Sequence, residues 1–208
     1  MDAATVTARG QSVVPGRPDE GIWTIAVSAL SESPEAALND VGGRSRSLEE
    51  LLEDLGVAPE KRSTTGVNVR EEFDWADGKQ LHRGFRAENV LTVRLADPAI
   101  AGRLIQESIA RAAANVRGPV WWIAPDNPAR VEACRRAAAE ARRKAEAYAE
   151  ALGLGLGAVV EVREPPPPSG AFPRARVLAA AAEAPPVDVD PGDLDVEANV
   201  EVTFRLDG

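Results

Sequence analysis

Apolar and polar residues alternate along four segments of the chain, and this period of two is typical of β-strands that bury one face. The cleanest alternation is the last, from Val196 to Leu206, where every intervening residue is polar or charged. Such a strand belongs to a sheet that is covered on one face only. The residues predicted to share a face in the four strands are Trp23, Ile25, Val27 and Ala29; Thr65, Val67, Val69 and Phe73; Phe85, Ala87, Leu91, Val93 and Leu95; and Val196, Ala198, Val200, Val202, Phe204 and Leu206.

Apolar residues at spacings of three and four predict three helices, and each is preceded by a capping residue and a proline. These pairs are Ser33-Pro34, Asp97-Pro98 and Asn127-Pro128. The first helix is expected over residues 34–55, weakened by Gly42 and Gly43, and the third over residues 128–152. The residues predicted to face the core are Leu38, Val41, Leu48, Leu52 and Leu55 in the first helix; Ile100, Leu104, Ile105, Ile109 and Ala112 in the second; and Val131, Cys134, Ala138, Ala141, Ala145, Tyr148 and Leu152 in the third.

The predicted order is strand, strand, helix, strand, strand, helix, strand, helix, strand, strand, with a hairpin turn at Asp77-Gly78. Hairpins mixed with helices predict an α+β fold, a mainly antiparallel sheet with about three helices packed on one face. A proline-rich segment at about residues 164–193 is expected to be a mobile insertion. Because the final strand must return to the sheet, we expect one domain over residues 1–208.

Charge and composition exclude several classes of function. The chain holds 24 Lys and Arg against 33 Asp and Glu, a net charge of −9, which argues against nucleic acid as the main partner. No apolar run approaches the length of a transmembrane helix. The start shows no signal peptide, so a cytoplasmic protein is expected, or a periplasmic or envelope protein if the chain is a mature form with a new start Met.

The stretch "ALGLGLGAVVEVRE", residues 151–164, resembles a phosphate-binding loop only in its glycines. A dinucleotide site needs the order strand, glycines, helix, whereas here the helix comes first. We therefore expect Gly153 to end the third helix in a left-handed turn. The acidic run "VDVDPGDLDVE" lacks the glycine and glutamate positions of an EF-hand and is expected to be a solvated turn before an edge strand.

No catalytic or metal-binding set is visible in the sequence, and no cofactor is expected. His82 is the only histidine and is expected to be exposed and non-catalytic, beside the hairpin. Cys134 is the only cysteine, and its place in the predicted apolar seam favours a buried structural thiol. The charges of "CRRAAAEARRKAEAYAE" have both signs, which predicts a salt-bridged solvent face.

Three tryptophans form a possible interaction surface. Trp121 and Trp122 are neighbours in a predicted strand, so at most one can fill a given core and the other is expected to face away. Trp75 lies near the hairpin tip, where burial is difficult. Exposed tryptophans are enriched in protein interfaces.

Four phrases, in this order, resemble the SIMPL-domain family, formerly a domain of unknown function. They are "VTARGQSVVPGRPDEGIWTIAVSALSESPEAAL", "TTGVNVREEFDWADGKQLHRGFRAENVLTVRL", "EACRRAAAEARRKAEAYAEALGLGLGAVVEV" and "PGDLDVEANVEVTFRL". The resemblance implies an α+β fold, bacterial envelope members made with a signal peptide, large homo-oligomeric rings and, for some members, a role in oxidative-stress defence. It supplies no agreed catalytic residues.

Together these observations predict a non-enzymatic, self-associating protein, a scaffold or stress-associated binding protein. One alternative is a small-molecule binder or enzyme using a cleft at the sheet edge. Another is a partner that recognises the extended "PPPP" segment.

Overall fold

The computed structural model describes residues 4–76, 78–165 and 189–208. Within these residues three α-helices and seven strands follow one another in the predicted order, and every strand pair is antiparallel. The α+β fold is thus confirmed, with the strands divided between two sheets rather than gathered in one. The elements are β1 (Thr5–Gly16), β2 (Glu20–Ser31), α1 (Pro34–Asp54), β3 (Arg62–Ala76), β4 (Lys79–Leu95), α2 (Ala101–Ala112), β5 (Asn115–Trp122), α3 (Pro128–Ala151), β6 (Gly155–Arg163) and β7 (Leu194–Asp207).

The described chain divides into two compact units. The four-stranded unit comprises residues 19–122, without residue 77, together with 189–191, and the three-stranded unit comprises residues 4–18, 123–165 and 192–208. Most of the insertion expected at residues 164–193 lies outside the described residues, so its mobility stays a prediction.

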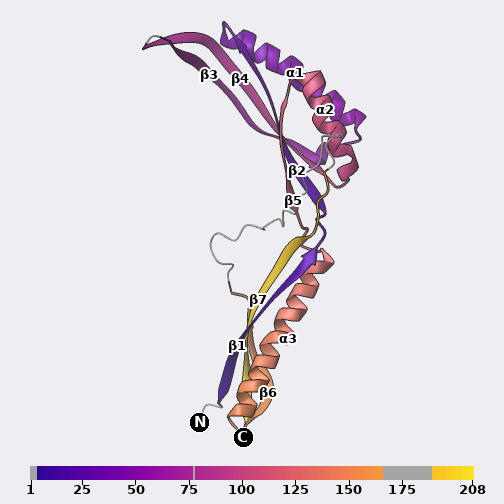
Figure 1. Cartoon of the computed structure of the whole chain (residues 1–208), viewed down its shortest axis with the longest axis vertical. Helices are drawn as coiled ribbons and strands as arrows, with labels where there is room; N and C mark the ends of the chain where they lie inside the picture. The colour runs from indigo at the N-terminus through magenta and orange to yellow at the C-terminus, as the bar shows by residue number, and fades with distance from the viewer. Residues whose placement is uncertain (1–3, 77, 166–188) are drawn as a thin grey trace, which may run out of the picture. The chain divides into compact units, whose positions relative to one another are not determined.

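The four-stranded unit has the strand order β3-β4-β2-β5, with α1 and α2 packed on one face (Figure 1). The predicted inward residues of β2 and β4 are confirmed, since Ile25, Val27 and Val93 are fully buried. Each predicted cap also holds: Ser33 accepts the N–H of Ala36, and Asp97 accepts the N–H of Ala99 ahead of a short 3-10 turn.

Two residues predicted to face this core are exposed, Leu38 of α1 and Ile109 of α2. The sheet-facing stripe of α1 runs through Ala37 and Val41, and that of α2 through Leu104 and Ser108. Each mistaken residue therefore lies one position beyond the stripe, where the helix surface has already turned toward solvent.

The three-stranded unit has the order β1-β7-β6, with α3 packed against β1 and β7. The alternation predicted for β7 is confirmed, with Val196, Val202 and Phe204 buried and the intervening charged residues outside. The expectation that it is an edge strand is wrong, because β1 and β6 pair with it on opposite sides. As the middle strand, β7 holds this sheet together.

Alanines form the buried stripe of α3, and the larger residues lie outside it. The stripe is Ala133, Ala137, Ala141, Ala145 and Ala149. The predicted seam through Val131, Cys134, Ala138, Tyr148 and Leu152 is therefore wrong, except for Ala141 and Ala145.

Gly10 of β1 explains why small residues are required on this face of α3. A Cβ atom at Gly10 would lie only 1.8 Å from the carbonyl oxygen of Ala137, so strand and helix backbones approach closely. A valine or tyrosine in the stripe would hold them apart. Cys134 is consequently exposed, which corrects the prediction of a buried thiol.

Gly153 ends α3 as predicted, with a φ angle of +70°. The N–H of Leu154 bonds the carbonyl of Ala149 at 2.9 Å and that of Gly153 bonds the carbonyl of Glu150 at 3.0 Å, the pattern of a Schellman motif. The glycines of residues 151–164 thus stop a helix.

A candidate interaction surface on the β3–β4 hairpin

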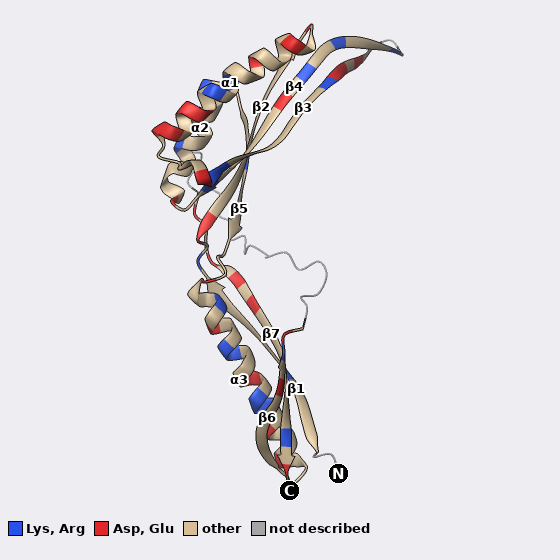
Figure 2. Ribbon diagram, turned by 180° about the vertical axis from the view of Figure 1, so that it is seen from behind, with Lys and Arg blue, Asp and Glu red and all other residues tan. Residues whose placement is uncertain are grey.

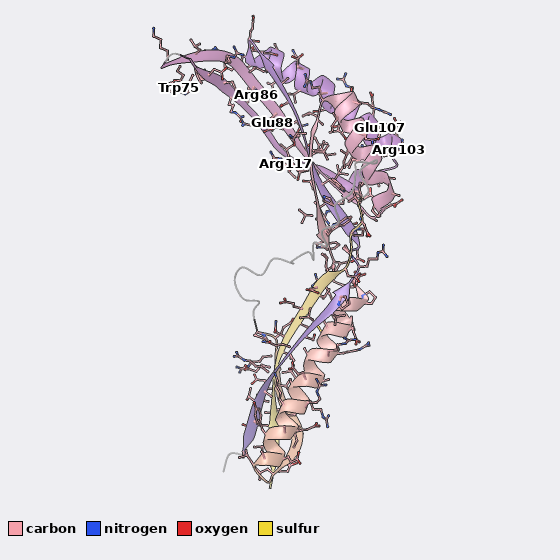
Figure 3. The ribbon with its side chains drawn as sticks, viewed as in Figure 1. Trp75, Arg86, Glu88, Arg103, Glu107 and Arg117 are labelled. Atoms are coloured by element: carbon pink, nitrogen blue, oxygen red, sulfur yellow. The ribbon has the colours of Figure 1, made fainter. Side chains whose placement is uncertain are left out.

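The structure separates the three tryptophans of the predicted surface. Trp75 pairs with Gln80 near the turn of the β3–β4 hairpin, whereas Trp121 pairs with Gly21 at the opposite end of the same sheet. Trp75 is 74% exposed, as expected for a residue at the hairpin tip (Figure 3).

Trp121 and Trp122 are both intermediate in exposure, so the expectation that one of them faces away from the core stays a prediction. Trp121 covers the backbone of Gly21, where a Cβ atom would lie 2.9 Å from its ring, and the guanidinium of Arg94 lies 5.7 Å from the centre of the Trp122 ring. Of the three tryptophans, Trp75 is thus the most exposed.

Beyond Ser31, the last residue of β2, the sheet continues as a ribbon of β3 and β4 alone (Figure 1). The turn of this hairpin contains Gly78 in a left-handed conformation, which confirms the predicted turn. We call residues 66–76 and 78–85 the outer hairpin. Its residues 72–76 and 78–84 form the two-stranded ribbon, whereas residues 66–70 pair with β4 where β4 also pairs with β2. An isolated two-stranded ribbon is only marginally stable in water. The contacts that its exposed side chains make therefore matter for its stability.

One face of the outer hairpin is largely apolar. It carries Val67, Val69, Phe73 and Trp75 on β3 and His82 and Phe85 on β4, together with the polar side chains of Glu71 and Gln80. The His82 ring lies between those of Phe73 and Phe85, with centroid distances of 5.3 and 5.4 Å. Val67 is 65% exposed and Phe73 is 41% exposed, because the face projects outside the cover of α1. An exposed apolar face of this kind is typical of a contact site.

The opposite face of the outer hairpin carries ion pairs. The carboxylate of Glu72 accepts a hydrogen bond from Arg86 at 3.0 Å and lies 3.8 Å from Arg70, and Asp74 lies 3.1 Å from Arg83. The hydrogen bond from Arg86 is the main cause that holds the pKa of Glu72 below its ordinary value. This face therefore satisfies its own charges, and the hairpin is amphipathic, with charge along both strands (Figure 2).

The side chains considered for catalysis do not form a site. His82 is exposed, as predicted, but its neighbours are aromatic rings. Cys134 belongs to the other unit. The hydroxyl of Ser108 has no hydrogen-bond partner among the described atoms, but it lies on the buried face of α2, out of reach of a substrate.

The described chain contains no group of three or more His, Cys, Asp or Glu side chains placed to hold a metal ion. None of its helices has an 18-residue stretch apolar enough to cross a lipid bilayer.

The salt-bridged surface predicted for α3 is confirmed. Arg136 pairs with Glu132 at 2.7 Å, Arg142 with Glu146 at 2.8 Å and Lys144 with Glu140 at 3.0 Å. Each pair joins residues one helical turn apart, and both signs of charge follow one another along the helix (Figure 2). Two arginines of α3, Arg136 and Arg142, are thus paired on their own helix.

Three of the four sheet edges carry features that oppose pairing with another strand. At the β1 edge, Glu140 accepts the N–H of Gln11 at 2.5 Å and Lys144 donates to the carbonyl of Arg9 at 3.0 Å, so side chains of α3 occupy that edge. The β5 edge contains Pro119, which has no N–H to donate. The β6 edge has two register shifts, each with an extra residue on β6 itself.

The fourth edge, β3, is long and regular. It has one extra residue of its own, at Thr65, and from Gly66 to Ala76 it contains neither a proline nor a further extra residue. The shift between Glu72 and Phe73 arises on β4, which passes over Arg83. Sequence reasoning missed this edge, because the order of strands in a sheet is not encoded locally.

The chain thus combines an α+β fold with an exposed amphipathic hairpin. It belongs to the SIMPL family, "Protein of unknown function (DUF541)", whose family model matches residues 6–204. This confirms the resemblance found in the sequence. No curated protein matches the chain.

Among solved structures, the chain is similar to a hydantoinase/carbamoylase family amidase from Burkholderia ambifaria. The two are 16% identical, the alignment covers 64% of this chain and 34% of the amidase, and the TM-score is 0.25. The chain thus spans about a third of that protein's length. A TM-score this low carries no inference about fold or activity.

Proposed function

We propose that this protein is a non-enzymatic SIMPL-domain scaffold or stress-associated binding protein that assembles with copies of itself through the outer hairpin. The observation that carries the proposal is the exposed apolar face around Trp75. Burying a large aromatic side chain at the centre of an interface contributes about 2 kcal/mol or more to binding.

The net charge of −9 opposes self-association, because identical subunits repel each other. At physiological salt the screening length is about 8 Å, so this repulsion is weak except between groups in direct contact. The acid and base side chains on the charged face of the hairpin already pair with one another. Burial of the opposite, apolar faces of two copies against each other can therefore contribute more free energy than the charge repulsion costs.

Light scattering of the full-length protein at micromolar concentration tests the proposal. We expect a mass of at least two subunits, and Trp75→Ala should weaken the assembly by about 30-fold in dissociation constant. Leu81→Ala is the matched control, since Leu81 is 49% exposed on the same hairpin but pairs with Asp74 on the charged face. It should leave the assembly unchanged, and circular dichroism should show that both variants fold.

A monomeric wild-type protein would overturn this proposal. The small-molecule binder or enzyme would then become the first hypothesis, to be tested by thermal-shift screening with metabolites. The compartment of the protein, cytoplasm or envelope, stays a prediction. Fractionation of cells that produce the native protein tests it.

A further inference from the structure

We propose that β3 pairs antiparallel with β3 of a second copy, with Glu71 of both copies at the two-fold axis. This inference rests on the proposed function and specifies which edge and which register the copies share. The result would be a continuous sheet in which β4, β3 and their counterparts in the second copy lie side by side.

The choice of edge follows from the contrast among the four edges described above. Natural sheets protect exposed edges against pairing, and β1, β5 and β6 each carry such protection. From Gly66 to Ala76 the β3 edge has no proline and no extra residue, and in the described chain no further strand lies beside it. Its one opposing feature is Glu71, a charged residue on the apolar face. The same segment presents the exposed apolar residues of the outer hairpin.

The choice of register follows from the sequence of β3 itself. Residues directly opposite in an antiparallel pair lie on the same face and contact each other. With Glu71 at the axis, Val67 lies opposite Trp75 of the second copy and Val69 lies opposite Phe73. On the charged face Arg70 lies opposite Glu72 of the second copy. By symmetry each of these pairs occurs twice.

Neighbouring registers are poorer. Centring the pair on Arg70 places two arginines opposite each other and sets Val69 against Glu71. Centring it on Glu72 places two glutamates together and sets Phe73 against Glu71. Shifting the pairing register by one residue would put apolar residues of one copy opposite charged residues of the other.

The proposed register has one unfavourable contact, between the two Glu71 carboxylates. Glu71 is exposed and takes no part in the ion pairs found in the described hairpin. Like charges directly opposite on neighbouring strands are destabilising. Glu71→Gln should therefore tighten the assembly, by about two- to fivefold in dissociation constant.

Glu88→Gln is the control for the change in net charge. Glu88 lies on β4, opposite Asn68 on the charged face, and is removed from the proposed axis (Figure 3). It changes the charge of the protein by the same amount. If both variants tighten the assembly equally, the effect comes from net charge and the register is wrong.

Disulfide cross-linking tests the register directly, in a Cys134→Ala background that removes the native thiol. Opposite residues in an antiparallel pair have Cα atoms about 4.5–5.5 Å apart, which suits a disulfide. Glu71→Cys should therefore give a covalent dimer on mild oxidation. Asn68→Cys should not, because its two copies would be roughly 20 Å apart along the strands.

A mixture of Asn68→Cys and Asp74→Cys proteins provides a positive control, since this register places those two positions opposite each other. If light scattering shows an assembly but Glu71→Cys cross-links no better than Asn68→Cys, the register is wrong and the proposed self-association stands. If the wild-type protein is a monomer, both proposals fail.

Discussion

Gly10 sets the distance between β1 and α3, and it does so by lacking a side chain. A Cβ atom there would overlap the carbonyl of Ala137 and would also lie 2.7 Å from the nitrogen of Ala141. Both contacts are with backbone, which cannot move aside as a flexible side chain can. The hydroxyl of Ser12, further along β1, donates to the carbonyl of Ala133 at 2.6 Å and supports the same close packing.

Gly10→Ala should therefore destabilise the protein by about 1–3 kcal/mol, the range found for overpacked cores, or more if the helix cannot shift. Gly43→Ala is the matched control, because Gly43 lies within α1 with nothing within 4 Å of its Cβ position. That change should stabilise the protein by about 1 kcal/mol through helix propensity. Urea unfolding measures both, and equal effects of the two substitutions would contradict the close approach at Gly10.

Glu140 links stability to pH. Its carboxylate accepts the N–H of Gln11 and pairs with Lys144, and these interactions, the first above all, lower its pKa from the ordinary value. A depressed pKa contributes stability that is fully present above the unfolded-state pKa and is lost as the pH falls through the lower folded-state pKa.

Glu140→Gln should accordingly lower the free energy of unfolding at pH 7, and the difference from wild type should shrink once the pH falls below the ordinary glutamate pKa of about 4.3. Glu132→Gln serves as the control, since Glu132 pairs with Arg136 on the helix alone. Chemical unfolding at several pH values gives the comparison. A difference that stays constant down to pH 3 would show that the carboxylate charge does not matter.

At the scale of elements, caps, turns and strand alternation can be predicted from neighbouring residues, whereas the exact buried stripe of a helix depends on its tertiary contacts, as Leu38 and Ile109 show. The Asn127 cap of α3, the Gly78 turn and the alternation of β7 depend on neighbours in sequence, and all were predicted. The alanine stripe of α3 was missed because Val131 and Tyr148 outrank alanine in hydrophobicity. Only the approach of β1 makes small residues the better core.

The same contrast between local and non-local signals applies to the candidate site. The exposure of Trp75 can be predicted from its position near a turn. The open edge of β3 follows from the strand order, in which β4 and β2 lie on one side of β3. The apolar alternation of β3 resembled that of a buried strand. The sequence could not show that α1 leaves Val67 and Val69 uncovered.

Removal of residues 194–208 should unfold the three-stranded unit, because β7 is the middle strand between β1 and β6. Burial of a large apolar side chain contributes about 1.5–3 kcal/mol, so several such residues on β7 approach the total stability of a domain. Hydrogen exchange should show loss of amide protection throughout α3 in the truncated protein. Retained amide protection in α3 would show that the three-stranded unit does not need β7 in order to fold.

At the scale of the whole molecule, the family match over residues 6–204 runs through both compact units. The chain enters the four-stranded unit at residue 19, leaves it at residue 122 and contributes residues 189–191 to it again, so the three-stranded unit is assembled from segments distant in sequence. A unit built in this way cannot be completed before the intervening residues are ordered or held close. This connectivity is the physical support for the prediction of one cooperative domain.

Intrinsic fluorescence can test that prediction, because Trp23, Trp75, Trp121 and Trp122 all belong to the four-stranded unit. Tryptophan emission thus reports on that unit, whereas a fluorophore attached to the exposed thiol of Cys134 on α3 reports on the other. In a single cooperative domain the two signals change with the same midpoint on heating, since coincident transitions are the mark of two-state unfolding. We expect coincidence, and Gly10→Ala, which acts only between β1 and α3, should lower both midpoints together. A variant in which the transition of the Cys134 fluorophore shifts while the tryptophan transition stays in place would show that the two units unfold independently.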